Sequence, residues 1–401
     1  MADLNLLTDW LALVIRWIHV IAGIAWIGAS FYFNWLEGNL ERQGKAPELA
    51  GDLWAVHGGG FYHVQKLKSA PTVLPGILHW FKWEAYLTWL SGMALLAIVY
   101  YLNAGAWLPR AGASFPDANT GIALGTGTLL AGWTVYHLLG KTRLIDRPLI
   151  FGILIFCLIT LTAWGLVQVF NGRAAYIHTG ALIGTIMVGN VFFVIIPAQK
   201  QMVTAARRGE PPPNPRLAVL AGRRSLHNNY FTLPVLFIMI SSHYPATYDG
   251  PLAWLTLALI AVAGIIVRHG FNLKNQRRTW RWFLPVAALI MLGIAMVRSR
   301  PVPAADSASA AAEQLTEIGA MALIDRHCRS CHAARPTDPA WPVAPGGLIL
   351  DHTDAVRARA SVIHQRVVVV RNMPFGNKSG MTPAERTALG TWLLSLQKEA
   401  P

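Results

Sequence analysis

Two cysteines and a histidine near the C-terminus form the pattern with the most specific chemistry in this chain, Cys328-x-x-Cys331-His332. Thiols at this spacing can add to the two vinyl groups of a haem, and the adjacent imidazole then faces the iron. A zinc site would need a second cysteine pair, whereas the remaining cysteine, Cys157, lies alone in an apolar run. We therefore predict one covalent haem c with His332 as proximal iron ligand.

The second axial ligand is expected downstream, and Met373 stands in a loop held by proline and glycine. Met381 is the alternative, but it directly precedes Thr382, Pro383 and Glu385, which are typical of a capping box at a helix start. A packing role is therefore favoured for Met381, and Met373 is predicted as the sixth ligand. An iron held by His and Met has no open position, so this haem would carry electrons rather than activate oxygen.

The C-terminal segment has the pattern of a small haem domain. The helix predicted from 384 to about 396 places four apolar residues on one face: Leu389, Trp392, Leu393 and Leu396. Three histidines of this segment are expected at its surface: His327, His352 and His364. We predict a class I-like cytochrome c domain over 314–401, preceded by a Pro/Ala/Ser linker over 298–313.

The remaining chain, 1–297, is predicted to be a polytopic membrane helical bundle, so that the fold class is all-α. Hydrophobic residues make up 54% of the sequence and charged residues only 13%, and several apolar runs reach the roughly 20 residues that a bilayer requires. About eight transmembrane helices are expected, near 11–33, 82–102, 121–139, 148–170, 174–197, 227–242, 252–268 and 280–297. The bilayer is thus the first predicted partner.

Basic residues alternate between the loops that join these spans. The odd-numbered loops are rich in Lys and Arg, while the even-numbered loops hold only Arg110 and Arg173. Because Lys and Arg accumulate in cytoplasmic loops, both termini are predicted to lie outside the cytoplasm, on the periplasmic side of a bacterial inner membrane. Attachment of c-type haem on the outer side agrees with this orientation. The net charge of +14 is then mainly a topological bias, and no nucleic-acid binding is predicted.

Polar residues inside spans are costly and mark candidate sites. In the predicted orientation, His19, His178 and His243 fall in the outer half of the bundle or at its rim. A pair of such histidines facing across the bundle could ligate a b-type haem. The alternative is that they only hydrogen-bond within the protein or to headgroups.

Two further clusters lie towards the predicted inner side. The segment 54–66 carries a glycine run with His63 and Lys66, and the segment 223–234 carries His227, Asn228 and Asn229 just before a proline that could break the helix. These groups suit a planar anion, with Lys66, Asn228 and Asn229 as contacts and His63 or His227 as a base. The alternative interpretation of 54–66 is a cytoplasmic linker with ordinary basic residues and no binding role.

Over nearly its whole length the chain resembles the bacterial membrane-bound, cytochrome c-linked urate oxidases. The resemblance rests on the stretch 17–37, the loop 54–66, the segment 227–245, and the Cys328-x-x-Cys331-His332 motif followed by Met373-Pro-Phe-Gly-Asn. It implies oxidation of urate to 5-hydroxyisourate, with electrons passed through the fused haem to cytochrome c or another respiratory acceptor instead of O2.

Residue chemistry leaves the location of the urate site open. An inner site would use His63, Lys66 and the 227–229 segment, and would need an intermediate electron carrier to reach an external haem. An outer site around His19, His178 and His243 would lie closer to the haem. Two rival functions are a respiratory quinol or other dehydrogenase subunit that exports electrons through the c haem, and a membrane-anchored electron-transfer module.

Overall fold

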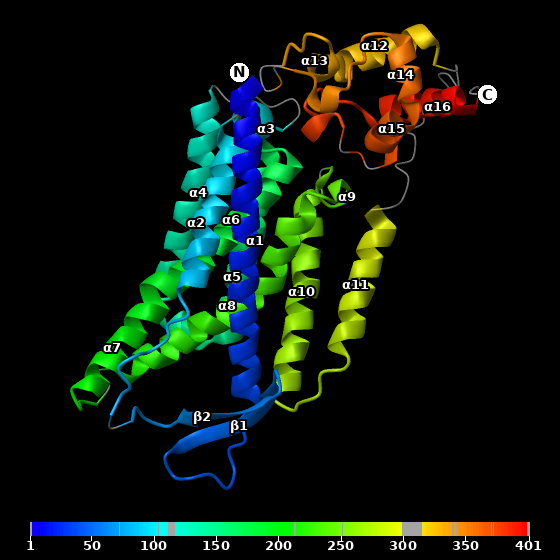
Figure 1. The fold of residues 1–401 in the computed structure, drawn as a ribbon. Helices are drawn as coiled ribbons and strands as arrows, with labels where there is room; N and C mark the ends of the chain where they lie inside the picture. The colour runs from blue at the N-terminus through cyan, green and yellow to red at the C-terminus, as the bar shows by residue number, and fades with distance from the viewer. Residues whose placement is uncertain are drawn as a thin grey trace.

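The computed structural model describes residues 2–71, 73–102, 104–110, 117–211, 214–250, 252–298, 315–338, 341, 343–369, 371 and 373–398. The predicted linker lies almost entirely outside these residues. Long, roughly parallel helices form one body, a small helical domain formed by the C-terminal residues lies at one end of it, and a β-hairpin lies at the other (Figure 1). The N-terminus lies at the same end as the C-terminal domain.

The helices of the long body follow the apolar runs. They are α1 (Ala2–Asn39), α2 (Trp83–Leu96), α3 (Ala104–Trp107), α4 (Ala118–Leu139), α5 (Pro148–Val169), α6 (Gly172–Asn190), α7 (Ile196–Arg207), α8 (Pro215–Ser241), α9 (Pro245–Tyr248), α10 (Ala253–Asn275) and α11 (Phe283–Arg298). Each of the eight predicted spans coincides with helix. By length and composition, five helical stretches of the described chain could cross a membrane: 7–39, 118–139, 148–169, 172–207 and 253–275. The count of eight spans stays a prediction.

Helix α6 forms the centre of this body. Almost every residue from Ala174 to Asn190 is buried, because α2, α4, α5 and α8 all pack against it. The peripheral helices instead expose large apolar side chains, such as Trp17, Leu130 and Leu289. Apolar surface of this extent is typical of a protein that contacts lipid, which agrees with membrane association.

Two π-helical turns interrupt the helices of the long body. One, Ala97–Tyr101, extends α2, and the other, Val191–Ile195, joins α6 to α7 in one continuous helix. Such turns shift the register of side chains and are frequent at functional sites. The first places Tyr101 against His178, and the second follows directly after Asn190.

Helix α8 continues through Pro234 to Ser241, so the predicted break at this proline is wrong. Gly264 of α10 faces this point, and a Cβ atom added to it would lie 3.2 Å from Leu233 and 3.5 Å from Pro234. The glycine lets α10 approach closely and cover the proline turn, and neighbouring helices of this kind allow proline inside membrane helices.

The segment predicted as a glycine-rich loop is a β-hairpin, which adds one pair of strands to a mostly helical fold. Strands β1 (Leu49–His57) and β2 (Gly60–Leu67) are antiparallel. Gly58 and Gly59 form the two-residue turn with φ of +57° and +79°, a conformation of tight hairpin turns that favours glycine. The glycines therefore fold a defined turn.

The C-terminal domain contains α12 (Glu317–His327), α13 (Arg329–His332), α14 (Thr353–Ala358), α15 (Ala360–His364) and α16 (Pro383–Lys398). The predicted apolar face of the last helix is confirmed: Leu389, Trp392, Leu393 and Leu396 are all buried in one core. Met381 is also buried there, at 2% exposure, in agreement with its predicted packing role.

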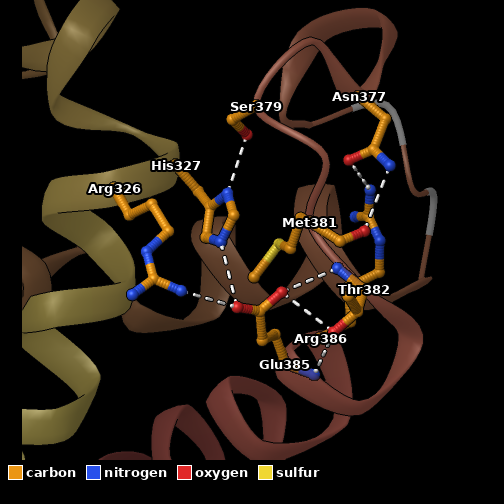
Figure 2. A network of polar contacts seen from close by, with 8 residues as sticks. All are labelled: Arg326, His327, Asn377, Ser379, Met381, Thr382, Glu385 and Arg386. Carbon is orange, nitrogen blue, oxygen red and sulfur yellow. Dashed lines mark hydrogen bonds and ion pairs between the residues drawn. The ribbon is translucent and has the colours of Figure 1, made fainter. Parts of the chain in front are cut away.

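The start of α16 has the predicted capping box (Figure 2). The Thr382 amide donates to Glu385 Oε2 over 2.8 Å, and the Glu385 amide donates to Thr382 Oγ1 over 3.2 Å. His327 was expected at the surface, but it is 5% exposed, pairs with Ser379 over 2.8 Å and lies 3.4 Å from Glu385. The Glu385 carboxylate thus caps α16 and also contacts His327 of α12. This contact between the two helices accompanies the burial of His327.

Candidate functional site

Polar side chains converge inside the helical body on two faces of α8. Positions 224 and 228 are one helical turn apart and share a face, while position 229 points to a neighbouring face. Arg224, Asn228 and Asn229 are all buried, with 1%, 6% and 2% exposure. Because unpaired polar groups inside an apolar bundle are costly, this concentration marks a candidate site.

The first face forms a network with α4 and α6. Asn190 Nδ2 donates to Asn228 Oδ1 over 2.8 Å and to the Tyr136 hydroxyl over 3.0 Å. The Tyr136 hydroxyl also pairs with His227 Nδ1 over 2.8 Å, and the His227 ring stacks on Phe151 with centroids 5.0 Å apart. His227 is thus held by one hydrogen bond and by ring contacts with Phe151 and Tyr136.

Arg224 brings a positive charge into this network. Its Nη1 donates to Asn190 Oδ1 over 3.3 Å, its Nη2 donates to the His137 carbonyl over 3.4 Å, and the guanidinium lies 4.6 Å from the ring centre of Tyr136. These partners are all neutral, and Nε has no hydrogen-bond partner in the described chain. A buried charge without a carboxylate partner favours the binding of an anion nearby.

The second face joins α8 to α10 and α1. Arg268 Nε and Asn272 Nδ2 both donate to Asn229 Oδ1 over 3.0 Å. The Arg268 guanidinium lies 3.9 Å from the ring centre of Phe31. Three buried atoms of this group have no hydrogen-bond partner among the described residues: Arg268 Nη2, Asn229 Nδ2 and Asn272 Oδ1.

A cavity of about 420 Å³ lies next to the second face, between the ends of α1 and α10. It is lined by Asn34, Glu37, Gly38, Arg42, Asn272, Asn275 and Gln276. Asn272 therefore belongs both to the cavity wall and to the group around Asn229. The volume falls in the usual range of small-molecule sites.

Among the predicted inner residues, the structure unites His227, Asn228 and Asn229 on α8 but keeps His63 and Lys66 apart from them on the hairpin. His63 pairs with Asp52 over 2.9 Å and stacks on Trp54 with centroids 4.3 Å apart. The Asp52 pKa is held below its usual value mainly by the hydrogen bond from Lys45 and also by His63. Lys66 pairs with Glu37 over 2.6 Å, at the cavity rim.

The three histidines predicted for the outer half lie on different elements and have different partners. His178 is fully buried, with Nδ1 bonded to the Ala174 carbonyl over 2.8 Å and Nε2 bonded to the Tyr101 hydroxyl over 3.0 Å. His19 bonds the Thr88 carbonyl over 2.9 Å, and His243 is exposed just past α8. Both ring nitrogens of His178 are thus engaged within the protein, and the b-type haem stays a prediction.

Inspection of the sequence missed Arg268 and Asn272 and did not single out Arg224 from its basic neighbours. A signal was present, because an arginine within or beside an apolar span is expensive and generally functional. Arg268 was passed over because it stands at the end of a predicted span, where basic residues commonly extend towards headgroups.

In the C-terminal domain, the predicted haem residues have a consistent arrangement. His332 Nδ1 bonds the Leu348 carbonyl over 3.1 Å, a contact that fixes the ring so that Nε2 is free to bind a metal. Cys328 lies in the domain core, and Met373 packs against the same core. Burial raises the pKa of the Cys328 thiol to about 12, as is usual for a thiol in apolar surroundings. The residues therefore fit the predicted haem c.

One arginine holds the loop that carries Met373. Arg386 of α16 donates to the carbonyls of Met373 and Val367 and, over 3.2 Å, to Asn377 Oδ1. Asn377 in turn donates to the Met381 carbonyl over 3.1 Å, as part of the network in Figure 2. The chain is thereby anchored on both sides of the predicted sixth ligand.

The same loop contacts the helical body. The Trp107 and Phe375 ring centres are 4.1 Å apart, and Trp107 also lies 6.1 Å from Trp341. The guanidinium of Arg173 lies 5.5 to 5.9 Å from the ring centres of Trp107, Phe375 and Tyr100. These residues form a docking surface between the C-terminal domain and the end of the bundle opposite the hairpin (Figure 1).

The fold and these contacts define a membrane-type helical bundle with a polar, cationic interior and a docked C-terminal domain. Residues 5–299 match the family described as urate oxidase N-terminal, and the chain belongs to that family. No curated protein and no solved structure matches the chain. The family relates the helical body to urate oxidation and supports an oxidoreductase, while the haem-type motif lies beyond the matched residues.

Proposed function

We propose that this protein oxidises urate to 5-hydroxyisourate in the membrane and passes the electrons through a haem c in residues 314–401 to a cytochrome c or another respiratory acceptor. The observation that carries the proposal is the pair of buried arginines, Arg224 and Arg268, which have no carboxylate partner in the described bundle of a urate-oxidase-related chain. Urate is a monoanion at neutral pH, so it would supply the missing negative charge.

The reaction balances as a hydroxylation by water. Urate and one water give 5-hydroxyisourate, two protons and two electrons, and the electrons leave in two single transfers because a haem c accepts one at a time. The oxygen atom that is added comes from water, so O2 is not consumed and no peroxide forms.

The chain's own residues would bind the anion and take up a proton. Arginine and asparagine side chains hold and orient a planar anion by charge and by hydrogen bonds. His227 lies in the network on the other face of α8, where Tyr136 orients its ring, so we propose it as the final acceptor of a proton released in the reaction rather than as a contact of the anion. His63 receives no role here, since its imidazole pairs with Asp52 on the hairpin.

Aromatic contacts support a path for the electrons towards the C-terminal domain. The ring of His178 lies 6.3 Å from Tyr100, Tyr100 lies 6.2 Å from Trp107, and Trp107 lies 4.1 Å from Phe375. Phe375 follows the predicted iron ligand Met373 by two residues. These contacts cover only the end of the bundle next to the C-terminal domain, so a urate site on the predicted inner side would also need an intermediate carrier, such as the b-type haem considered above. From there the electrons would enter the domain at the loop that Arg386 holds.

The proposal is tested by adding urate anaerobically to the purified, oxidised full-length protein and recording the visible spectrum. We expect the bands of reduced c-type haem, with half an equivalent of urate reducing one equivalent of haem. The Cys328→Ala variant should lose the covalent haem and its bands. If urate leaves the spectrum unchanged while dithionite reduces the haem, the proposal is wrong, and reduction by a quinol would then indicate a respiratory subunit.

A further inference from the structure

The group around Asn229 has hydrogen-bonding capacity that the protein does not use. Arg268 Nη2 and Asn229 Nδ2 are unused donors, and Asn272 Oδ1 is an unused acceptor. All three residues are at least 94% buried. Leaving one buried group unpaired costs about 1 to 3 kcal/mol, and more for a charged group, so three in one place indicate a ligand that would pair with them.

The pattern of these atoms defines the class of that ligand. Two donors, one of them cationic, call for acceptors with negative charge, and the acceptor calls for an N–H group on the same molecule. The Phe31 ring at 3.9 Å holds the guanidinium by a cation–π contact. An oxidised purine anion matches, because it combines carbonyl oxygens, ring N–H groups and a delocalised negative charge in one plane.

The cavity between α1 and α10 provides the space and the access. Its wall shares Asn272 with this group and adds the amides of Asn34, Asn275 and Gln276. It lies where α1 ends and α10 ends, beside the hairpin and opposite the C-terminal domain (Figure 1). A ligand would therefore enter from the hairpin end, which the distribution of basic loops predicts to be cytoplasmic.

The one carboxylate in the cavity wall does not oppose an anion. Glu37 pairs with Lys66 over 2.6 Å and with Arg42 over 2.9 Å. The rim therefore carries two positive charges for one negative charge. Lys66 acts here by neutralising Glu37, at a distance from the buried arginine.

Arg224 is less suited to this role than Arg268. Both of its terminal nitrogens already donate, to Asn190 and to the His137 carbonyl, so that only Nε is unused. Arg224 thus reinforces the network around His227, whereas Arg268 keeps its terminal nitrogen Nη2 unpaired and adjoins Asn272 of the cavity wall through their shared partner Asn229.

We propose that the urate anion binds between α1 and α10 against Arg268, Asn229 and Asn272, and that it reaches this site from the hairpin end. This inference rests on the proposed function and adds to it the binding residues and the side of access.

Equilibrium binding of urate to the dithionite-reduced, full-length protein tests the residues, because the reduced protein cannot accept electrons and no turnover occurs. We expect Arg268→Gln to raise the Kd at least thirtyfold, equivalent to about 2 kcal/mol. Arg268→Lys should recover part of the affinity by restoring the charge without the fork of donors. The control Arg223→Gln removes the arginine that precedes Arg224 in the sequence and pairs with Asp146 at the surface. This variant should bind urate with the wild-type Kd.

The outcomes separate the two proposals. If the wild type binds no urate and is not reduced by it, the proposed function fails. If the wild type binds urate and Arg268→Gln binds equally well, or if only Arg224→Gln loses affinity, the function stands and the site proposed here is wrong.

A second measurement covers the case in which Arg268→Gln does not fold. Gln276→Cys places a thiol on the cavity wall, in a Cys157→Ser background that leaves only the two haem cysteines. In inside-out vesicles, a membrane-impermeant maleimide should label this thiol, and urate should slow the labelling at concentrations near its Kd. Labelling that urate does not slow, or that occurs only from the opposite face, would overturn the proposed site.

Discussion

Replacing Gly140 by alanine should destabilise the protein through Arg224. Gly140 caps the end of α4 with φ of −74° and ψ of −6°, an ordinary helical conformation, so the backbone does not require glycine there. A Cβ atom at this position would lie 1.7 Å from Nη2 and 2.3 Å from Cζ of Arg224. The glycine is therefore required for the space that the buried guanidinium occupies.

The size of the effect follows from the hydrogen bonds of Arg224. Ordinary contact begins at 3.4 Å, so the guanidinium would have to move by about 1.7 Å, which lengthens its bonds to Asn190 and His137 beyond hydrogen-bond range. Two hydrogen bonds from a charged donor contribute about 2 to 4 kcal/mol to the free energy of unfolding when, as here, the bonds are long. Replacing glycine by alanine usually raises the free energy of unfolding by only about 0.4 to 1 kcal/mol. A net loss of about 1 to 3 kcal/mol is expected.

Thermal unfolding of the purified protein measures this loss, with Gly127→Ala as a matched control in the same helix. A Cβ atom at Gly127 would have no atom within 4 Å, so the control should be neutral or slightly stabilising. If Gly140→Ala unfolds at the wild-type temperature while Gly127→Ala behaves as expected, then Arg224 is not held by these bonds and its place in the network is wrong.

Three further predictions concern the C-terminal domain and the end of the bundle next to it. Burial raises the pKa of Asp249 to about 6, so the folded chain binds a proton that the unfolded chain releases, and the free energy of unfolding should fall by up to about 3 kcal/mol as the pH rises from about 4 to about 6. Asp249→Asn should remove this fall in pH-dependent thermal melts. Thr382→Ala should cost about 1 kcal/mol in the same melts, because it removes the cap that Glu385 completes; an unchanged melting temperature would contradict the capping role. Trp107→Ala should increase hydrogen exchange in the segment around Phe375, because it removes the ring contact at 4.1 Å; unchanged exchange would mean that this contact does not hold the C-terminal domain.

Features that depend only on residues close together in the sequence could be predicted from it. The apolar runs predicted the helices, since length and hydropathy are properties of each segment alone. Likewise, the capping box at Thr382 and Glu385 and the apolar face of α16 are confirmed. The hairpin was missed although its signal is also local: Gly58 and Gly59 join two runs that contain aromatic and β-branched residues.

Features that depend on contacts between distant segments could not be read from the chain. His327 was expected at the surface, yet a carboxylate 58 positions away in α16 accompanies its burial. The continuity of α8 through Pro234 depends on Gly264 in another helix. A residue's burial and its partners are set by what packs against it, which no single segment contains.

By itself, the sequence determined which segments are helical and apolar, and it carries the Cys328-x-x-Cys331-His332 pattern and the family relationship of residues 5–299. Only the tertiary structure decided which polar residues share a site. It separated His63 from His227 and brought Arg268 to Asn229, because the packing of α8 against α6 and α10 joins side chains about 40 positions apart. Helical periodicity assigns a residue to a face, but helix packing determines what that face meets.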